Sequence, residues 1–169
     1  MLKLIQTQYH KYHAFVEAQI KTICSNGGHA ILLHSYAPKS VGISSVDHEI
    51  VQKLHWAYSQ ERYDTWPIRP EVDVICKDTE GTVLVNKLWL DSLVQQCRSL
   101  GLNTAEGESY PLHPITMAHH YWQKYPNNIL CLEIRRDLLV DNFTPFSEMS
   151  GNPNKMDEIA RVIANTIPA

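Results

Sequence analysis

Paired cysteines, long apolar runs and clusters of basic residues are all missing from this sequence of 169 residues. None of its four cysteines forms a Cys-x-x-Cys pair, which argues against a zinc ribbon or a disulfide framework and predicts reduced cysteines in the core. No apolar run approaches the roughly 20 residues of a membrane-spanning helix, and the N-terminus lacks the features of a signal peptide. These absences predict a soluble, cytoplasmic protein.

The charge pattern argues against further classes of partner. The formal net charge is -3, and acidic and basic residues are interspersed without a basic run, so the sequence has no electrostatic footprint for nucleic acid or for an anionic membrane surface. Internal repeats and a glycine-rich phosphate loop are also lacking. The length suits one domain spanning residues 1–169. The nine histidines leave metal binding and acid–base chemistry open.

The first part of the chain has the periodicity of a long amphipathic helix. Its apolar residues recur at steps of three and four, at Ile5, Tyr9, Tyr12, Val16, Ile20 and Ile23. This spacing predicts a helix that buries this face. Its end is expected at residues 25–28, where two glycines tolerate the left-handed conformation common at helix C-termini.

Four short apolar stretches further along the chain have the pattern of buried strands, near Ala30, Val72, Leu102 and Ile129. The intervening segments predict helices within residues 44–62, 85–101 and 157–167, and another that ends near Tyr125. Strands that alternate with helices favour a three-layer α/β/α domain, in which helices cover both faces of a mostly parallel central sheet.

The last of these strands carries a carboxylate, Glu133, in an apolar setting. Side chains alternate across a strand, so Glu133 should share one side of the sheet with Cys131, while Leu130, Leu132 and Ile134 share the other. A carboxylate at the end of an interior strand either pairs with a cation or keeps a raised pKa for proton transfer. The sequence leaves both interpretations open, because arginines follow at positions 135 and 136.

A histidine, His34, ends the strand that begins at Ala30. The carboxyl ends of strands in open α/β folds border the ligand crevice, so His34 is a candidate site residue, although a lone histidine at such a place is more often a hydrogen-bonded structural residue than a metal ligand. His119 and His120 are adjacent on a predicted helix and therefore face different ways, so at most one of them points into any single site.

Three segments in this order resemble the N-formylglutamate amidohydrolase family. They are residues 9–13 (Tyr-His-Lys-Tyr-His), 30–38 (Ala-Ile-Leu-Leu-His-Ser-Tyr-Ala-Pro) and 130–139 (Leu-Cys-Leu-Glu-Ile-Arg-Arg-Asp-Leu-Leu). The resemblance implies a phosphorylase/hydrolase-like fold of the zinc-carboxypeptidase type, and an enzyme that splits a formyl amide with a metal-bound water. It also implies that His34 is a zinc ligand and that Glu133 is the general base, a role in which a carboxylate takes a proton from metal-bound water.

The sequence departs from the family in two places. The family's first metal ligands precede the helix that contains residues 9–13, so the chain corresponds to the central and C-terminal part of the family domain. Because catalytic zinc usually has three protein ligands, we expect one of three situations: the chain is part of a longer protein, the metal site is lost, or substitutes complete it. Candidate substitutes are His113, His119, His120 and Asp78. The second departure is an inserted segment at residues 39–70, which puts the substrate in question.

The leading hypothesis is a metal-dependent hydrolase of an N-formyl or other N-acyl amino acid such as N-formylglutamate. Arg135 or Arg69 would bind the carboxylate of this small-molecule substrate through paired hydrogen bonds, and Ser35 and Asn103 are further candidate substrate-binding residues. The alternative is a catalytically inactive remnant of the fold that acts as a binding or interaction module. A missing N-terminal strand would leave an exposed sheet edge, so we expect either a homodimer or a chain cut from a longer one.

Overall fold

A four-stranded sheet organises the chain in this computed structural model, which describes residues 2–43 and 45–168. The strands are β1 (Ala30–Tyr36), β2 (Val72–Val74), β3 (Thr104–Glu106) and β4 (Ile129–Arg135), in the order β1-β4-β2-β3. The β1/β4 and β2/β3 pairs are parallel and the β2/β4 pair is antiparallel. The predicted α/β domain with a mostly parallel sheet is therefore confirmed.

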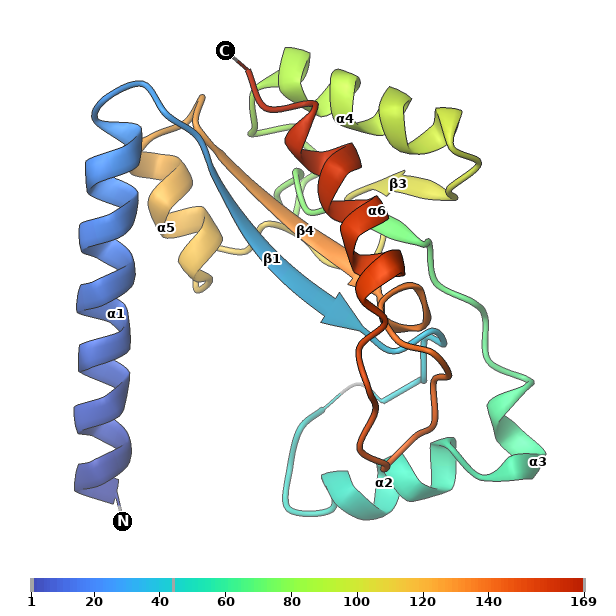
Figure 1. The fold of residues 1–169 in the computed structure, drawn as a ribbon. Coiled ribbons are helices and arrows are strands. Elements are labelled where there is room, and N and C mark those ends of the chain that lie inside the picture. Colours follow the sequence, from blue (N-terminus) through green and yellow to red (C-terminus); the bar gives the residue numbers. More distant parts are fainter. Residues whose placement is uncertain (1, 44, 169) are drawn as a thin grey trace.

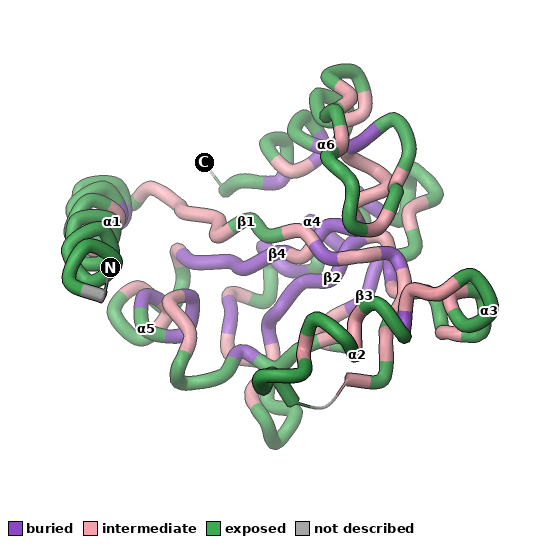
Figure 2. The backbone as a smooth tube through the Cα atoms, turned by 90° about the horizontal axis from the view of Figure 1, so that it is seen from below, coloured by how far each residue is buried: buried purple, intermediate pink, exposed green. Residues whose placement is uncertain are grey.

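Helices flank the sheet on both sides. They are α1 (Leu2–Cys24), α2 (Ile50–Ala57), α3 (Gln60–Tyr63), α4 (Lys87–Ser99), α5 (Met117–Lys124) and α6 (Pro153–Ala164), with a short 3-10 helix, η1 (Arg136–Leu138), after β4. Helices α4 and α6 contact one another on one side of the sheet, α5 packs against β4 on the other, and α1 stands beside β1 (Figures 1 and 2). This arrangement gives the three layers expected from the sequence.

Side-chain caps fix where several helices begin. The side chains of Asn86, Thr116 and Asn152 accept hydrogen bonds from backbone N–H groups in the first turns of α4, α5 and α6, respectively. Because Asn152 caps α6 and Pro153 occupies its first turn, this helix begins earlier than the apolar periodicity predicts. The helix expected within residues 44–62 is divided into α2 and α3, and its predicted first residue, Ser44, lies outside the described residues.

The main core lies between the sheet and α4. Leu130, Leu132 and Ile134 of β4 are fully buried, as are Trp89 and Leu90 of α4. All four cysteines are buried and free, in agreement with the prediction of reduced core residues. This packing fixes one face of β4 in the interior, so Cys131 and Glu133 project from its other face.

The prediction that α1 buries its apolar stripe is wrong for most of its length. Ile5, Tyr9 and Tyr12 are each more than half exposed, whereas Ile20 and Cys24 are buried. The helix meets the sheet only through its C-terminal end, and Figure 2 shows almost its entire backbone as exposed. Periodicity identifies the apolar face of a helix but not the length over which a partner covers it. Within residues 2–43 and 45–168, no helix is long and apolar enough to span a membrane.

Candidate active site

Three polar side chains form a row across neighbouring strands. His34 of β1 pairs with Glu133 of β4, and Glu133 pairs in turn with Asp73 of β2. Directly paired residues project to the same face of a sheet, and adjacent strands lie about 4.8 Å apart. The sheet register thus brings an imidazole and two carboxylates together, although these residues are far apart in the sequence.

A pocket of about 390 Å³ opens on this face of the sheet. His34, Cys131 and Glu133 form its sheet wall together with Ile75. The rest of the lining comes from the segment before α5 and from the start of α5, namely Tyr110, Pro111, Leu112, His113, Thr116, Met117 and Ala118. Cys131 and Glu133 share this pocket while the alternate residues of β4 are buried in the core, so the predicted alternation of β4 is confirmed.

Glu133 carries the strongest chemical signal in the pocket. Its Oε2 atom is buried and has no hydrogen-bond partner among the described residues. Burial raises the pKa of the Glu133 carboxyl and the negative charge of Asp73 acts in the same direction, against the opposing effects of His34, Arg69 and Arg136. A carboxyl group with a raised pKa and a free oxygen is suited to take up and release a proton.

Asp73, unlike Glu133, is fully hydrogen-bonded and has a structural role. It is fully buried, and its Oδ1 accepts hydrogen bonds from the N–H groups of Gly107 (2.9 Å) and Glu108 (3.2 Å), while Oδ2 accepts one from Ser109 (2.5 Å). Both oxygens are therefore occupied by backbone donors. The carboxylate ties the loop after β3 to the sheet and places a fixed negative charge beside Glu133.

Arg69 lies beside the pocket with its guanidinium next to two aromatic rings. The guanidinium is 4.9 Å from the ring centre of Tyr36 and 5.4 Å from that of Tyr110, which are favourable cation–π distances. The Tyr36 hydroxyl donates a hydrogen bond to the carbonyl oxygen of Pro70 (2.7 Å), and burial raises the pKa of Tyr36 to about 12. Since Tyr110 also lines the pocket, the cation of Arg69 stands at its rim.

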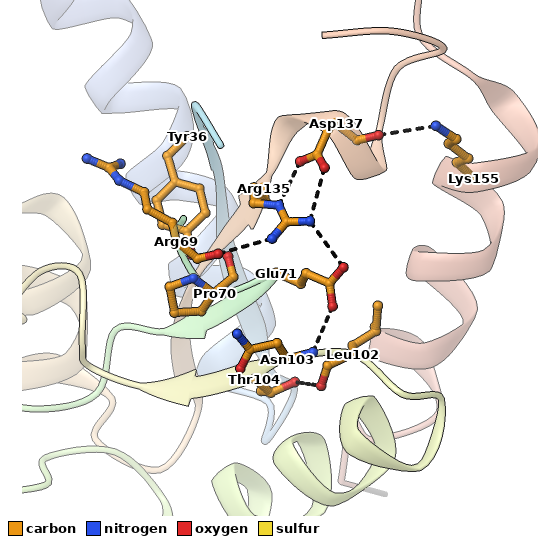
Figure 3. A network of polar contacts seen from close by, with 10 residues as sticks. All are labelled: Tyr36, Arg69, Pro70, Glu71, Leu102, Asn103, Thr104, Arg135, Asp137 and Lys155. Carbon is orange, nitrogen blue, oxygen red and sulfur yellow. Dashed lines mark hydrogen bonds and ion pairs between the residues drawn. The ribbon is translucent and has the colours of Figure 1, made fainter. Parts of the chain in front are cut away.

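Arg135 and Asn103 lie together in a separate network, drawn in Figure 3. The Arg135 guanidinium donates to both carboxylate oxygens of Asp137 (2.8 and 3.0 Å), to Glu71 (3.2 Å) and to the carbonyl oxygen of Arg69 (3.1 Å). The backbone N–H of Asn103 donates to the other Glu71 oxygen (2.8 Å). Neither of these predicted substrate-binding residues lines the pocket, and the guanidinium of Arg135 is already occupied by two carboxylates.

Ser35 faces the other side of the sheet from His34. It pairs with Ile134, and its hydroxyl and carbonyl oxygens lie near the Arg136 guanidinium, at 3.4 and 3.2 Å. Of the predicted site residues, the structure thus brings His34 and Glu133 together in the pocket with Arg69 at its rim, and places Ser35, Asn103 and Arg135 elsewhere.

The donors around the pocket do not fit the zinc site that the family resemblance implies. Among the described residues, no group of three or more His, Cys, Asp and Glu side chains is placed to hold a metal ion. Both Asp73 oxygens are occupied by backbone donors. Burial and the neighbouring Glu133 raise the pKa of the Cys131 thiol to about 12, so it remains protonated and is a poor ligand. His34 and Glu133 alone fall short of the three protein ligands usual for catalytic zinc.

The proposed substitute ligands do not complete the set. His113 lines the pocket, but its Nδ1 accepts a hydrogen bond from the N–H of Ile115 (3.2 Å). His119 is buried with its Nδ1 unpartnered among the described residues, and it does not line the pocket. His120 is exposed on α5, and one oxygen of Asp78 accepts hydrogen bonds from the N–H groups of Glu80 and Thr82 in a turn.

Comparison with known proteins gives a likeness in fold. No protein-family model matches the sequence, and no curated protein matches it. The chain is similar to a crystal structure of an N-formylglutamate amidohydrolase from Ralstonia eutropha JMP134, with a TM-score of 0.57 and 16% identity, over 94% of this chain and 49% of that one. A gene product of Agrobacterium tumefaciens matches with a TM-score of 0.49 and 15% identity, over 94% and 50% of the two chains.

The fold resembles that of an N-formylglutamate amidohydrolase. This likeness agrees with the resemblance of the three sequence segments to the same family. What the two structures share is the fold. The chain spans about half the length of the solved structures that it matches.

Two features of the site were not predicted from the sequence. Asp73 interrupts an apolar strand just as Glu133 does, and a carboxylate among buried residues was a usable signal. Tyr110 gave no comparable signal, because it lies in a polar loop without periodicity. Tyr110 directly follows residues 107–109, whose N–H groups donate hydrogen bonds to Asp73, so these contacts help to place it at the pocket.

Proposed function

We propose that this fold hydrolyses the amide bond of an N-acyl amino acid, with Glu133 as the group that moves the proton. The observation that carries the proposal is the buried, unpartnered oxygen of Glu133, on a carboxyl with a raised pKa, next to His34 in a pocket. The likeness in fold to an N-formylglutamate amidohydrolase supports the same reaction class.

In the proposed reaction, the Glu133 carboxylate accepts a proton from a water molecule as the water oxygen attacks the acyl carbonyl carbon. The carbonyl π electrons move to the oxygen, and an N–H group of the His34 imidazole donates a hydrogen bond to the resulting oxyanion. Glu133 then returns the proton to the amide nitrogen, and the C–N bond breaks. The products are a carboxylic acid and a free amino acid, so atoms and charges balance.

Arg69 is the proposed binding group for the α-carboxylate of the substrate. Its guanidinium stands at the rim of the pocket against Tyr36 and Tyr110, whereas that of Arg135 is engaged by Asp137 and Glu71. A guanidinium binds a carboxylate through two parallel hydrogen bonds. The stacking on two rings fixes its position and lowers the entropy lost when the ligand binds.

The test is release of formic acid from N-formyl amino acids, N-formylglutamate included, by the purified chain. Replacing Glu133 by glutamine should lower kcat/KM by about 10²- to 10⁴-fold, the usual contribution of a general acid–base group. Glu61→Gln is the matched control, because Glu61 is exposed on α3 and remote from the pocket lining. Assays run with added Zn²⁺ and with a chelator show whether the reaction depends on metal. Undiminished turnover by the Glu133→Gln variant would contradict the proposal.

A second candidate function is binding without turnover. It is favoured by the donor set, since the described residues do not group three side chains suited to a metal ion. In this case the chain would bind an N-acyl amino acid saturably in calorimetry, yet release no product with or without Zn²⁺. The two candidates therefore differ in turnover but not in binding.

A further inference from the structure

We propose that the pocket selects N-acyl amino acids whose side chain is apolar, in preference to those with an acidic side chain such as glutamate. The inference rests on the proposed function, because it concerns the substrate of the same site. It is carried by the chemistry of the pocket walls beyond His34 and Glu133.

Beyond the polar row, most of the pocket lining is apolar, with His113 and Thr116 as polar exceptions. Leu112, Ala118 and Ile75 are buried, and Pro111, Met117 and Cys131 complete this part of the lining. The raised pKa of Cys131 keeps the thiol neutral. At about 390 Å³, the pocket is within the usual range for small-molecule sites, about 300–1,000 Å³. An apolar side chain placed here would exchange water for hydrocarbon contacts.

A carboxylate would meet no fixed positive charge in the same space. The pocket lining contains neither lysine nor arginine. Glu133 lines the pocket and the fully buried Asp73 is its neighbour in the sheet, and both disfavour another negative charge. Burying a carboxylate without a cation is costly because its hydration is lost.

The two histidines that line the pocket do not supply the missing positive charge for a substrate side-chain carboxylate. His113 lines the pocket but is exposed, and its Nδ1 accepts a hydrogen bond from the N–H of Ile115, so this nitrogen is already engaged. His34 lies beside Glu133 at the polar end, where the reacting acyl group is placed. The guanidinium of Arg69 stands at the rim and is assigned to the α-carboxylate.

The polar and apolar ends of the pocket therefore bind different parts of the substrate. The acyl carbonyl lies at the His34–Glu133 end, the α-carboxylate lies at the rim, and the side chain extends toward Leu112 and Met117. In this arrangement an acidic side chain is the part that would lose its hydration without compensation.

The experiment compares kcat/KM for N-formyl-L-leucine, N-formyl-L-methionine and N-formyl-L-glutamate. The wild-type chain should prefer the apolar substrates by about 100-fold, a typical discrimination by a side-chain pocket. Met117→Lys should reduce this preference at least tenfold, because it introduces a cation at the apolar end. Met156→Lys is the matched control and should leave the preference unchanged, since Met156 is exposed on α6, away from the pocket.

Two further measurements distinguish failure of the selectivity inference from failure of the proposed function. If Met117→Lys fails to fold, Pro111→Lys provides the same cation at an exposed lining position. Calorimetric binding of the three compounds to the Glu133→Gln variant measures selectivity without turnover. Tighter binding of the leucine compound by this variant, together with no turnover of any of the three compounds by the wild-type chain, would support the pocket inference and reject the proposed function. Equal or tighter binding of the glutamate compound, or no binding of any compound, would overturn the inference.

Discussion

Glu133 and Asp73 are neighbouring carboxylates in one sheet, yet their surroundings give them opposite chemical behaviour. Three backbone N–H groups donate to Asp73 and occupy both of its carboxylate oxygens. One oxygen of Glu133 is buried without a partner, and burial together with the charge of Asp73 raises its pKa. A pair of acids whose environments differ in this way can divide the work, one as a fixed charge and the other as the proton carrier.

The raised pKa of Glu133 predicts the pH dependence of the proposed activity. A general base works in its ionised form, so kcat/KM should rise with pH as Glu133 loses its proton. Because burial raises this pKa above its ordinary value of 4.5, the rising limb should have its midpoint above pH 4.5. Initial rates measured from pH 4 to pH 8 locate the midpoint. A limb centred at or below 4.5 is the result that contradicts the assignment.

The same shift predicts how Glu133 affects stability. The folded-state pKa lies above the unfolded-state value, so the unfolded chain ionises first as the pH rises and folding loses free energy through that window. Glu133→Gln should therefore raise Tm at pH 7, and the gain should disappear below about pH 4, where the carboxyl is protonated in both states. Calorimetric scans at both pH values check this, and an equal gain at both would point to a cause other than ionisation.

The alternation along β4 could be predicted from the sequence, but the partners of Glu133 could not. Strand geometry alone places Glu133 with Cys131. The pairing of Glu133 with His34 and Asp73 depends on the order and register of three strands, which connect residues far apart in the chain. Arg135 illustrates the same limit: its sequence position suggests a substrate ligand, whereas the fold brings Glu71, distant in the sequence, to its guanidinium alongside the nearby Asp137.

At the level of elements, the loop after β3 depends on a backbone conformation that favours glycine. Gly107 has a φ of 67°, and a Cβ atom added there would lie 3.3 Å from the Cβ of Lys77. Its N–H is also one of the three donors to Asp73. Left-handed backbone and a close neighbour together make this position intolerant of side chains.

Replacement of Gly107 by alanine should therefore destabilise the fold by about 1–2 kcal/mol and lower the proposed activity, because the loop leads into the pocket wall at Tyr110. Gly81→Ala is the matched control: Gly81 also has a positive φ, 86°, but open space around it and no contact with Asp73. It should lose stability while its kcat/KM stays near that of the wild type. Equal losses of activity in both variants would show that the loop has no special part in the site.

Helix α1 shows why the bounds of a helix can be predicted from the sequence more accurately than the contacts that the helix makes. Its periodicity correctly predicts a helix that ends before Gly27, whose φ is 81°. The same periodicity cannot show which turns reach the sheet. Burial of Ile20 and Cys24 against Tyr121 and Ile129 fixes the C-terminal end, and the remainder of the stripe extends past the sheet into solvent.

At the scale of the whole molecule, two exposed features lie on the same side of the fold. Strand β1 forms one edge of the sheet, and its Leu33 is 57% exposed. Helix α1 stands beside this strand (Figure 1) and exposes a run of large apolar side chains, namely Leu4, Ile5, Tyr9, Tyr12, Phe15 and Ile23. Soluble proteins usually cover large apolar patches and open sheet edges with a partner.

We predict that a second copy of the chain covers this side, so that the protein is a homodimer. Leu4 and Phe15 are each 64% exposed on α1, and burying side chains of this size contributes about 1.5–3 kcal/mol each. A Leu4→Glu, Phe15→Glu double variant should therefore weaken the dimer by at least about 100-fold in Kd. Light scattering after size exclusion should give twice the chain mass of 19.4 kDa for the wild type and the single mass for the variant.

Leu88→Glu provides the control, because Leu88 is also apolar and 82% exposed but lies on α4. This variant should keep the wild-type mass, since its surface is separate from α1 and β1. A wild-type chain that remains monomeric across the concentration range would contradict the prediction. If only the Leu88→Glu variant dissociated, the dimer interface would instead be assigned to the surface of α4. Because the pocket opens between the sheet and α5, on the layer opposite α4, these two outcomes also separate a dimer next to the site from one behind it.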